Sequence, residues 1–240
     1  MTTFVLVPGF WLGAWAWRSV ARSLRAAGHE AFPMTLTGLA DRSHLASPEV
    51  GLDTHVTDIV QKLRYEELTD VVLVGHSGGG MAVTMVADQV PERLRRVIYV
   101  DSGPLPDGMA QIDFNPPEAQ AEVRAQIESE GEGWRVPVPA FDPEADPVNL
   151  AGLDEAALRR MRALGTPQPA RTSTDPVRLR GEGKPVPATV VLCTMPTAQA
   201  KQMLGTAVEY AELPTGHWPM FSRPAELADL LVTIGAGDAS

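Results

Sequence analysis

A serine set between glycines, at the point where an apolar run ends, most constrains how this chain can fold. The stretch VVLVGHSGGGMAV, residues 71–83, runs from four apolar residues into GHSGG and then into a helical pattern. Such a strand–turn–helix context is where a G-x-S-x-G sequence exposes a nucleophilic serine beside the N-terminus of a helix. We therefore predict that Ser77 is a nucleophile and that Gly75 and Gly79 allow strand and helix to approach closely. The alternative is a glycine-rich structural turn that contains a serine.

Apolar runs alternate with helical patterns at both ends of the chain. Continuous apolar runs are typical of parallel strands that are covered on both faces. We expect strands at 4–7, 30–34, 71–74, 96–100, 188–193 and 208–213, and helices at 15–27, 54–63, 79–90, 197–204 and 224–234. Asp53 is expected to cap the second of these helices and Gly28 to end the first. The alternation predicts an α/β fold with a mostly parallel sheet flanked by helices.

The segment between the fourth and fifth expected strands has a different character. Residues 104–187 are rich in proline and contain two short amphipathic pieces, 118–127 and 154–164. The segment also has apolar side chains to bury, namely Phe114, Trp134, Phe141, Leu150, Leu158 and Met161. We therefore predict a core formed by residues 1–103 and 188–240, with residues 104–187 inserted as a cap.

Composition excludes several partners. The 240 residues carry a net charge of −10 without a dense Lys/Arg cluster, which argues against nucleic acid as a partner. No apolar run approaches the ~20 residues of a membrane helix, so no membrane partner is expected. Cys193 is the only cysteine, and the start of the chain lacks a basic leader, so the cytoplasm is the expected location. No motif for a metal or another cofactor stands out, so none is expected.

Four stretches together resemble a known family. They are FVLVPGFWLGAWAW, VVLVGHSGGGMAV, IYVDSGPLPDG and LPTGHWPMFSRP, and they flank the predicted cap on both sides. The chain resembles the α/β-hydrolases, and within them the small esterase and hydroxynitrile-lyase group that includes plant methyl-salicylate esterases. The resemblance implies an α/β-hydrolase fold with His217, in the turn after the last strand, as the catalytic base. Many such proteins pair, which suggests a homodimer. His76 is expected to be a buried hydrogen-bonding residue.

The acid of the predicted triad departs from the family pattern. Its usual place is the loop after the strand at 188–193, but residues 193–199 (CTMPTAQ) hold no carboxylate. Asp101 ends the strand that follows the helix of the nucleophile, on the same edge of the sheet. The order Ser77, Asp101, His217 preserves the serine–acid–histidine order of the fold. We predict Asp101 as the acid. The alternatives are an aspartate that only caps a turn, a Ser–His dyad, or an acid from the cap.

An oxyanion hole is expected from two backbone N–H groups, that of Gly78 and that of Phe10 in the loop after the first strand. Relatives carry His-Gly in this loop, whereas this chain has Pro8-Gly9, so the support of the loop is an open question. Core packing at a loop–helix junction is expected for the aromatic residues of WLGAWAW, and a place at the border of the pocket is the alternative for Trp11. The side chains predicted to line a substrate pocket are Trp11, Met109, Phe114, Trp134, Phe141 and Trp218.

These features predict a serine hydrolase that acts on a small hydrophobic ester, lactone or related acyl substrate through an acyl-enzyme. One alternative is a catalytically idle or non-hydrolytic protein with the same fold. Another is a hydroxynitrile-type lyase. Such lyases carry threonine in the first turn and lysine after the base, where this chain has Gly9 and Trp218.

Overall fold

A six-stranded sheet forms the centre of the protein in a computed structural model that describes residues 1–181, 185–205 and 207–237. The strand order is β2-β1-β3-β4-β7-β8, and each neighbouring pair is parallel. The strands are β1 (Thr3–Val7), β2 (Glu30–Pro33), β3 (Val71–His76), β4 (Leu94–Val100), β7 (Ala188–Leu192) and β8 (Glu209–Glu212). The predicted parallel sheet is confirmed, with strand ends that differ by one or two residues.

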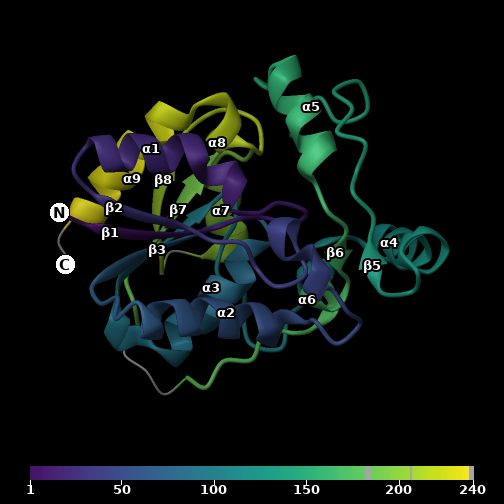
Figure 1. Ribbon diagram of the computed structural model, residues 1–240, viewed down its shortest axis with the longest axis horizontal. Coiled ribbons are helices and arrows are strands. Elements are labelled where there is room, and N and C mark those ends of the chain that lie inside the picture. Colours follow the sequence, from purple (N-terminus) through teal and green to yellow (C-terminus); the bar gives the residue numbers. More distant parts are fainter. Residues whose placement is uncertain (182–184, 206, 238–240) are drawn as a thin grey trace.

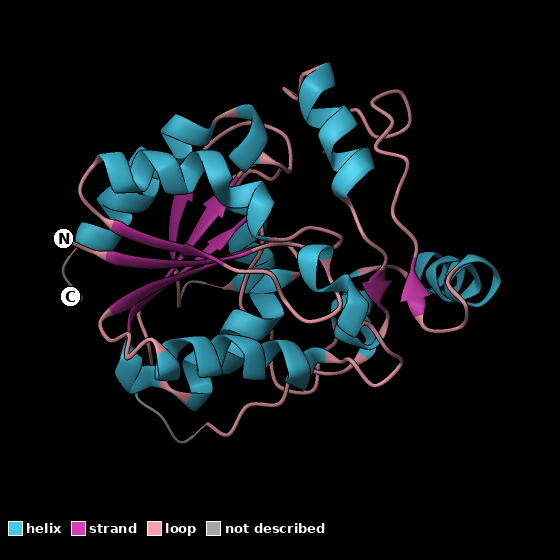
Figure 2. Ribbon diagram, in the orientation of Figure 1, coloured by secondary structure: helices cyan, strands magenta, loops and turns pink. Residues whose placement is uncertain are grey.

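Helices cover both faces of this sheet. Figures 1 and 2 show α1, α8 and α9 on one face and α2 and α3 on the other. The helices are α1 (Arg18–Ala26), α2 (Leu52–Tyr65), α3 (Gly79–Gln89), α4 (Pro117–Glu130), α5 (Glu155–Leu164), α6 (Arg171–Thr174), α7 (Thr197–Leu204), α8 (Pro219–Ser222) and α9 (Pro224–Ala236). Short 3-10 turns are η1 (Ala14–Trp17), η2 (Ala40–Leu45), η3 (Pro91–Arg93) and η4 (Gln111–Phe114). In the described ranges, no helix has the length and apolar character needed to cross a membrane.

Strand β1 explains why the expected strands are apolar without alternation. Phe4 and Leu6 belong to the core cluster that includes residues of α1 and α9, whereas Val5 and Val7 belong to the cluster that includes residues of α2 and α3. All four side chains are fully buried. Because successive side chains of a strand point to opposite faces, a sheet covered on both sides needs apolar residues at every position.

Two helix starts differ from the sequence expectation. The helix expected over 15–27 begins as the 3-10 turn η1 and becomes α-helical only at Arg18. Gly28 follows its end with a φ of +85°, the left-handed conformation for which glycine is favoured. The N-cap of α2 is Gly51, and Asp53 lies in the first turn. The Asp53 carboxylate accepts instead from Arg178, at 3.0 Å, so the expected cap is wrong.

Residues 104–187 contribute no strand to the large sheet within their described part. They contain η4, α4, α5, α6 and a small antiparallel pair of strands, β5 (Arg135–Val136) and β6 (Gln168–Pro169). In Figure 1 the elements α4, α5 and β5 lie to one side of the sheet. Four of the six side chains expected to be buried here are buried, namely Phe141, Leu150, Leu158 and Met161. Trp134 is half-buried, and Phe114 is 43% exposed, so the burial expected for Phe114 is wrong.

Candidate active site

Ser77 lies in the tight turn between β3 and α3. Its φ of +48° is left-handed, a strained conformation for a residue with a side chain, and such strain often marks functional sites. Three hydrogen bonds hold the turn. The Ser77 N–H donates to the carbonyl of Val100 at 3.1 Å, and the Ser77 carbonyl accepts from the N–H of Gly80 and the hydroxyl of Ser102, at 2.9 and 2.8 Å. The turn is therefore anchored to β4 and to the loop that follows it.

The glycines on either side of Ser77 are required by close packing. A Cβ atom at Gly75 would lie 2.6 Å from the side chain of Val83 in α3, and one at Gly79 would lie 2.5 Å from the carbonyl oxygen of Pro8. Neither distance is compatible with a real side chain. The expectation that these glycines let the strand, the helix and the loop after β1 approach is confirmed.

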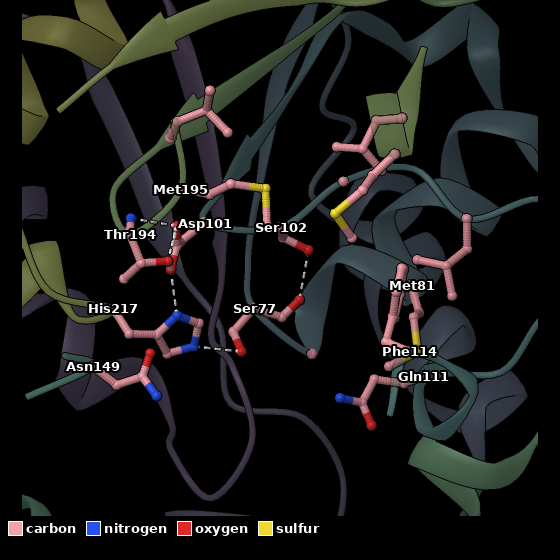
Figure 3. A pocket seen from close by; sticks show the side chains of 16 residues that line it. Ser77, Met81, Asp101, Ser102, Gln111, Phe114, Asn149, Thr194, Met195 and His217 are labelled. Atoms are coloured by element: carbon pink, nitrogen blue, oxygen red, sulfur yellow. Dashed lines mark hydrogen bonds and ion pairs between the residues drawn. The ribbon is translucent and has the colours of Figure 1, made fainter. Parts of the chain in front are cut away.

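His217 follows β8 and reaches back to Ser77 over the carboxyl edge of the sheet. Its Nε2 lies 2.8 Å from Ser77 Oγ, and its Nδ1 lies 2.5 Å from Asp101 Oδ2 (Figure 3). The His217 backbone N–H donates to the carbonyl of Asn149, at 2.8 Å. The structure thus brings together the predicted nucleophile, base and acid in one hydrogen-bonded chain.

His76 holds the backbone of His217 by a hydrogen bond. It is fully buried, and its Nε2 donates to the backbone carbonyl of His217 at 2.7 Å, which confirms its expected role as a buried hydrogen-bonding residue. Burial, together with the neighbouring His217 charge, lowers the pKa of His76 to about 3, so its ring is neutral at ordinary pH. A neutral ring with its proton on Nε2 donates this bond without placing a second positive charge beside the base.

Asp101 directly follows β4 in a left-handed conformation, with a φ of +44° and a side chain only 7% exposed. Burial raises the pKa of its carboxyl, but the hydrogen bond and charge of His217, together with two backbone N–H groups, outweigh burial and lower this pKa to about 2. The group is therefore ionised at neutral pH and faces Nδ1 of His217. A carboxylate in this place selects the tautomer whose Nε2 is free to accept a proton from serine.

The loop after β7, where relatives carry their acid, donates hydrogen bonds to Asp101 instead. The N–H groups of Cys193 and Thr194 both lie 3.1 Å from Asp101 Oδ1, and the Thr194 hydroxyl lies 3.1 and 3.0 Å from its two oxygens. The acidic residues of β8 are engaged elsewhere, Glu209 with Arg96 and Glu212 with Thr197. The chain thus keeps donors where a carboxylate is expected and takes the carboxylate from β4.

The two backbone N–H groups predicted to form an oxyanion hole lie on adjoining segments. The ring of Phe10 packs directly on Gly78, because a Cβ atom at Gly78 would lie 2.3 Å from two atoms of this ring. Among the described residues, neither N–H group donates to another protein group. Unpaired backbone donors near a serine hydroxyl are what an oxyanion requires.

A cavity of about 320 Å³ opens in front of Ser77 and His217. In Figure 3, Met81, Phe114 and Gln111 lie on the opposite side of Ser77 from His217 and Asn149. The walls are mainly apolar and include Met81, Leu105, Phe114, Leu192, Met195, Met203 and Leu204, with Ser102, Gln111, Asn149 and Thr194 as polar members. This composition suits a small apolar ligand held by a few polar groups.

Of the side chains predicted to line a pocket, only Phe114 lines this cavity. Trp11, Phe141 and Trp218 instead stack edge to face, with ring centres 6.3 and 5.8 Å apart, and Trp218 packs behind the ring of His217. Met109 packs against the core cluster that includes residues of α2 and α3, and the ring of Trp134 stacks with the guanidinium of Arg135. These five aromatic or apolar side chains therefore serve packing, because tertiary contacts turn them away from the cavity.

Sequence reasoning missed the methionines and amides of the cavity. Met195 follows β7 at the carboxyl edge of the sheet. The reasoning that placed Asp101 at the site, from its position at the end of a strand, could therefore also have placed Met195 there. Met81, Met203, Gln111 and Asn149 had no comparable signal in the sequence. Within the described parts of the chain, no group of three or more His, Cys, Asp or Glu side chains is arranged to hold a metal ion.

The parallel sheet, the strained serine turn and the histidine after the last strand define an α/β-hydrolase. The chain belongs to the alpha/beta hydrolase family, which matches residues 4–230. The resemblance seen in the sequence and the predicted fold class are both confirmed.

Two relatives span the whole chain. The carbendazim hydrolyzing esterase of Nocardioides sp. (strain SG-4G) is 32% identical over 252 residues, which cover 98% of this chain and 100% of that protein. Methylesterase 3 of Arabidopsis thaliana is 26% identical over 258 residues, which cover 96% and 94%. These relatives confirm the prediction of an ester-cleaving hydrolase at the level of its class.

A solved structure shows the same fold. It is an extracellular alpha/beta-hydrolase from a Paenibacillus species, described as sharing structural and functional homology with tobacco salicylic acid binding protein 2. The two chains superpose with a TM-score of 0.85 over 99% of this chain and 100% of the other, at 24% identity. This likeness supports the assignment of the fold.

Proposed function

We propose that the protein is a serine esterase in which Ser77 is the nucleophile, His217 the general base and Asp101 the acid that orients it. The hydrogen-bonded chain from Asp101 through His217 to Ser77, at the mouth of a mainly apolar cavity, carries the proposal. The activated serine needs its base within hydrogen-bond reach, and the base needs an orienting group. His217 Nε2 lies 2.8 Å from Ser77 Oγ, and the Asp101 carboxylate is in close contact with Nδ1 of the same ring.

The proposed reaction runs in two halves. Ser77 Oγ attacks the ester carbonyl carbon while its proton moves to His217 Nε2, and the ionised Asp101 stabilises the imidazolium. The N–H groups of Phe10 and Gly78 hold the negative charge on the former carbonyl oxygen. His217 then gives its proton to the departing alcohol oxygen, leaving an acyl-enzyme. Water, activated by His217, attacks the acyl carbon and releases the acid and free Ser77.

We propose methyl esters of small aromatic acids as the substrate class. The cavity volume of about 320 Å³ lies at the lower end of small-molecule sites. Its three methionines and Phe114 offer polarizable, adaptable contacts to an aromatic ring. The methylesterase among the relatives supports methanol as the leaving group, and the carbendazim hydrolyzing esterase supports carbendazim as a second probe.

We also propose that residues 104–187 act as a cap on a core of residues 1–103 and 188–240. Gln111, Phe114 and Asn149 come from this segment and line the cavity, which supports a role in substrate recognition. A cytoplasmic location is proposed from the lone Cys193, which is buried and has no cysteine partner. A homodimer stays a prediction from the family resemblance.

The structure gives little support to the lyase alternative. A departing cyanide needs a cation, and no lysine or arginine is among the side chains that line the cavity in the described parts of the chain. The position after His217 is Trp218, which is 4% exposed and packs behind the base. The idle alternative is tested directly by turnover.

The test is hydrolysis of methyl benzoate by purified protein, followed as release of benzoate, with carbendazim as second substrate and methyl laurate as the control for a long aliphatic acyl chain. We expect kcat/KM for methyl benzoate to exceed that for methyl laurate by at least about tenfold. Loss of the nucleophile in Ser77→Ala is expected to lower kcat by about 10⁶-fold. Turnover that survives in Ser77→Ala, or no turnover of any ester by the wild type, would overturn the proposal.

A further inference from the structure

The loop that carries the Phe10 N–H needs an anchor, because Pro8 replaces the histidine found in relatives. Trp11, the next residue, has a φ of +65°. A left-handed conformation is unfavourable for a bulky side chain and persists only when surrounding contacts hold it. Because Trp11 directly follows Phe10, the contacts that fix the backbone of Trp11 also restrain the segment that carries the Phe10 N–H.

The backbone of Trp11 is bonded on both sides by the segment 166–168, which is distant in sequence. The Trp11 N–H donates to Oε1 of Gln168 at 3.0 Å, and the Trp11 carbonyl accepts from the N–H of Thr166 at 2.9 Å. Gln168 is only 1% exposed. Breaking the hydrogen bond between Gln168 and Trp11 would leave a buried amide oxygen without a donor, which is costly in free energy. This hydrogen bond therefore restrains the loop strongly.

The hydrogen bonds around Gln168 fix which end of its amide faces the loop. Its Nε2 donates to Thr172 Oγ1 at 2.8 Å, and the Thr172 hydroxyl donates to the carbonyl of Pro169 at 2.6 Å. The single hydroxyl proton of Thr172 is used on Pro169, so toward Gln168 its oxygen can only accept. A rotated amide would set two acceptors, Oε1 and Thr172 Oγ1, against each other and two donors, Nε2 and the Trp11 N–H, against each other.

We propose that Gln168 is a positioning residue for the oxyanion hole, acting through the backbone of Trp11 on the N–H of Phe10. The inference rests on the proposed esterase function. It assigns to a buried amide of the segment 104–187 the support that relatives place in the loop itself. Because the Phe10 ring packs on Gly78, a shift of this loop changes the spacing of the two N–H groups proposed to bind the oxyanion.

The test compares Gln168→Met, which keeps the length but removes both polar atoms, with Gln168→Glu. Burial favours the protonated form of the introduced carboxyl group, which then offers an acceptor to Trp11 and a donor to Thr172. Complete loss of one oxyanion donor lowers the rate by about 10²–10³-fold, and this sets the upper limit for a donor that is only misplaced. We expect kcat for methyl benzoate to fall about 10- to 100-fold in Gln168→Met with KM within twofold. Gln168→Glu should retain kcat within about fivefold. The rate of Ser77 labelling by a fluorophosphonate should fall in parallel with kcat.

The matched control is Ser173→Ala, which removes a buried hydroxyl from α6 that donates to the carbonyl of Ala170, at 2.9 Å, and has no bond to the loop. It should lower the melting temperature without changing kcat. If Gln168→Met does not fold, Gln168→Asn, whose shorter amide cannot reach Trp11, takes its place. A folded variant with wild-type kcat, or equal losses of kcat in Gln168→Met and Ser173→Ala, overturns the proposal. An inactive wild type overturns the esterase function instead.

Discussion

The hydrogen bonds around Asp101 make the effect of Asp101→Asn predictable in detail. Oδ1 accepts from the backbone N–H groups of Cys193 and Thr194, and these groups can only donate. In the variant the amide oxygen must therefore take the place of Oδ1. Its NH₂ group then occupies the place of Oδ2, which lies 2.5 Å from Nδ1 of His217.

An NH₂ group in that place requires Nδ1 to accept, which moves the ring proton to Nε2. Nε2 is the atom 2.8 Å from Ser77 Oγ, and a protonated Nε2 cannot take the proton of Ser77. Holding the histidine in the wrong tautomer costs a serine protease about 10⁴-fold in turnover, or about 5 kcal/mol of activation free energy. We expect a loss of kcat of the same order, on the order of 10⁴-fold, with little change in KM.

The assay is the initial rate of methyl benzoate hydrolysis by wild type and variant at pH 8, with circular dichroism to show that both are folded. Asp101 lines the cavity, but Asn has nearly the same shape as Asp, so the walls keep their form and an unchanged KM serves as an internal control. A folded Asp101→Asn whose kcat is within tenfold of the wild type would refute the triad. That result would favour a Ser–His dyad or an acid from residues 104–187.

Two further predictions concern the same carboxylate. The pKa of Asp101 falls from 3.8 to about 2 on folding, so its stabilising effect is fully present above pH 4 and is lost as the pH falls toward 2. In urea unfolding, the wild type should therefore lose about 2 kcal/mol of stability between pH 5 and pH 2 through this group, and Asp101→Asn should lack that part of the loss. Thr194→Val removes the hydroxyl that donates to both oxygens of Asp101 and should lower kcat about tenfold. Thr197→Val, at the start of α7, removes a hydroxyl bonded to Glu212 and should leave kcat unchanged. Equal effects of the two substitutions would contradict the role of Thr194.

The sheet and the serine turn were predictable because their signals are local. The run Val71–Val74 is apolar at every position since β3 is covered on both faces, and the glycines of GHSGG are required by contacts with α3 and the loop after β1. Asp101 was accessible to the same reasoning, because the carboxyl ends of neighbouring parallel strands meet at one edge. These features need only the order of strands and helices along the chain.

The walls of the cavity were not predictable in this way. Phe114 and Phe141 are both aromatic residues of the same proline-rich segment, yet one lines the cavity and the other stacks with Trp11 and Trp218. The difference depends on how the segment 104–187 folds back on the core, through contacts such as that of Gln168 with Trp11. Such contacts join residues far apart in sequence and leave no periodic pattern.

The most direct test of the account is covalent labelling of Ser77 by a fluorophosphonate, followed by intact mass and peptide mapping. We expect one adduct per chain on Ser77 of the wild type, no adduct in Ser77→Ala, and a labelling rate in Asp101→Asn that falls together with kcat. An adduct on another residue, or ester hydrolysis that continues after Ser77 is fully labelled, would contradict it.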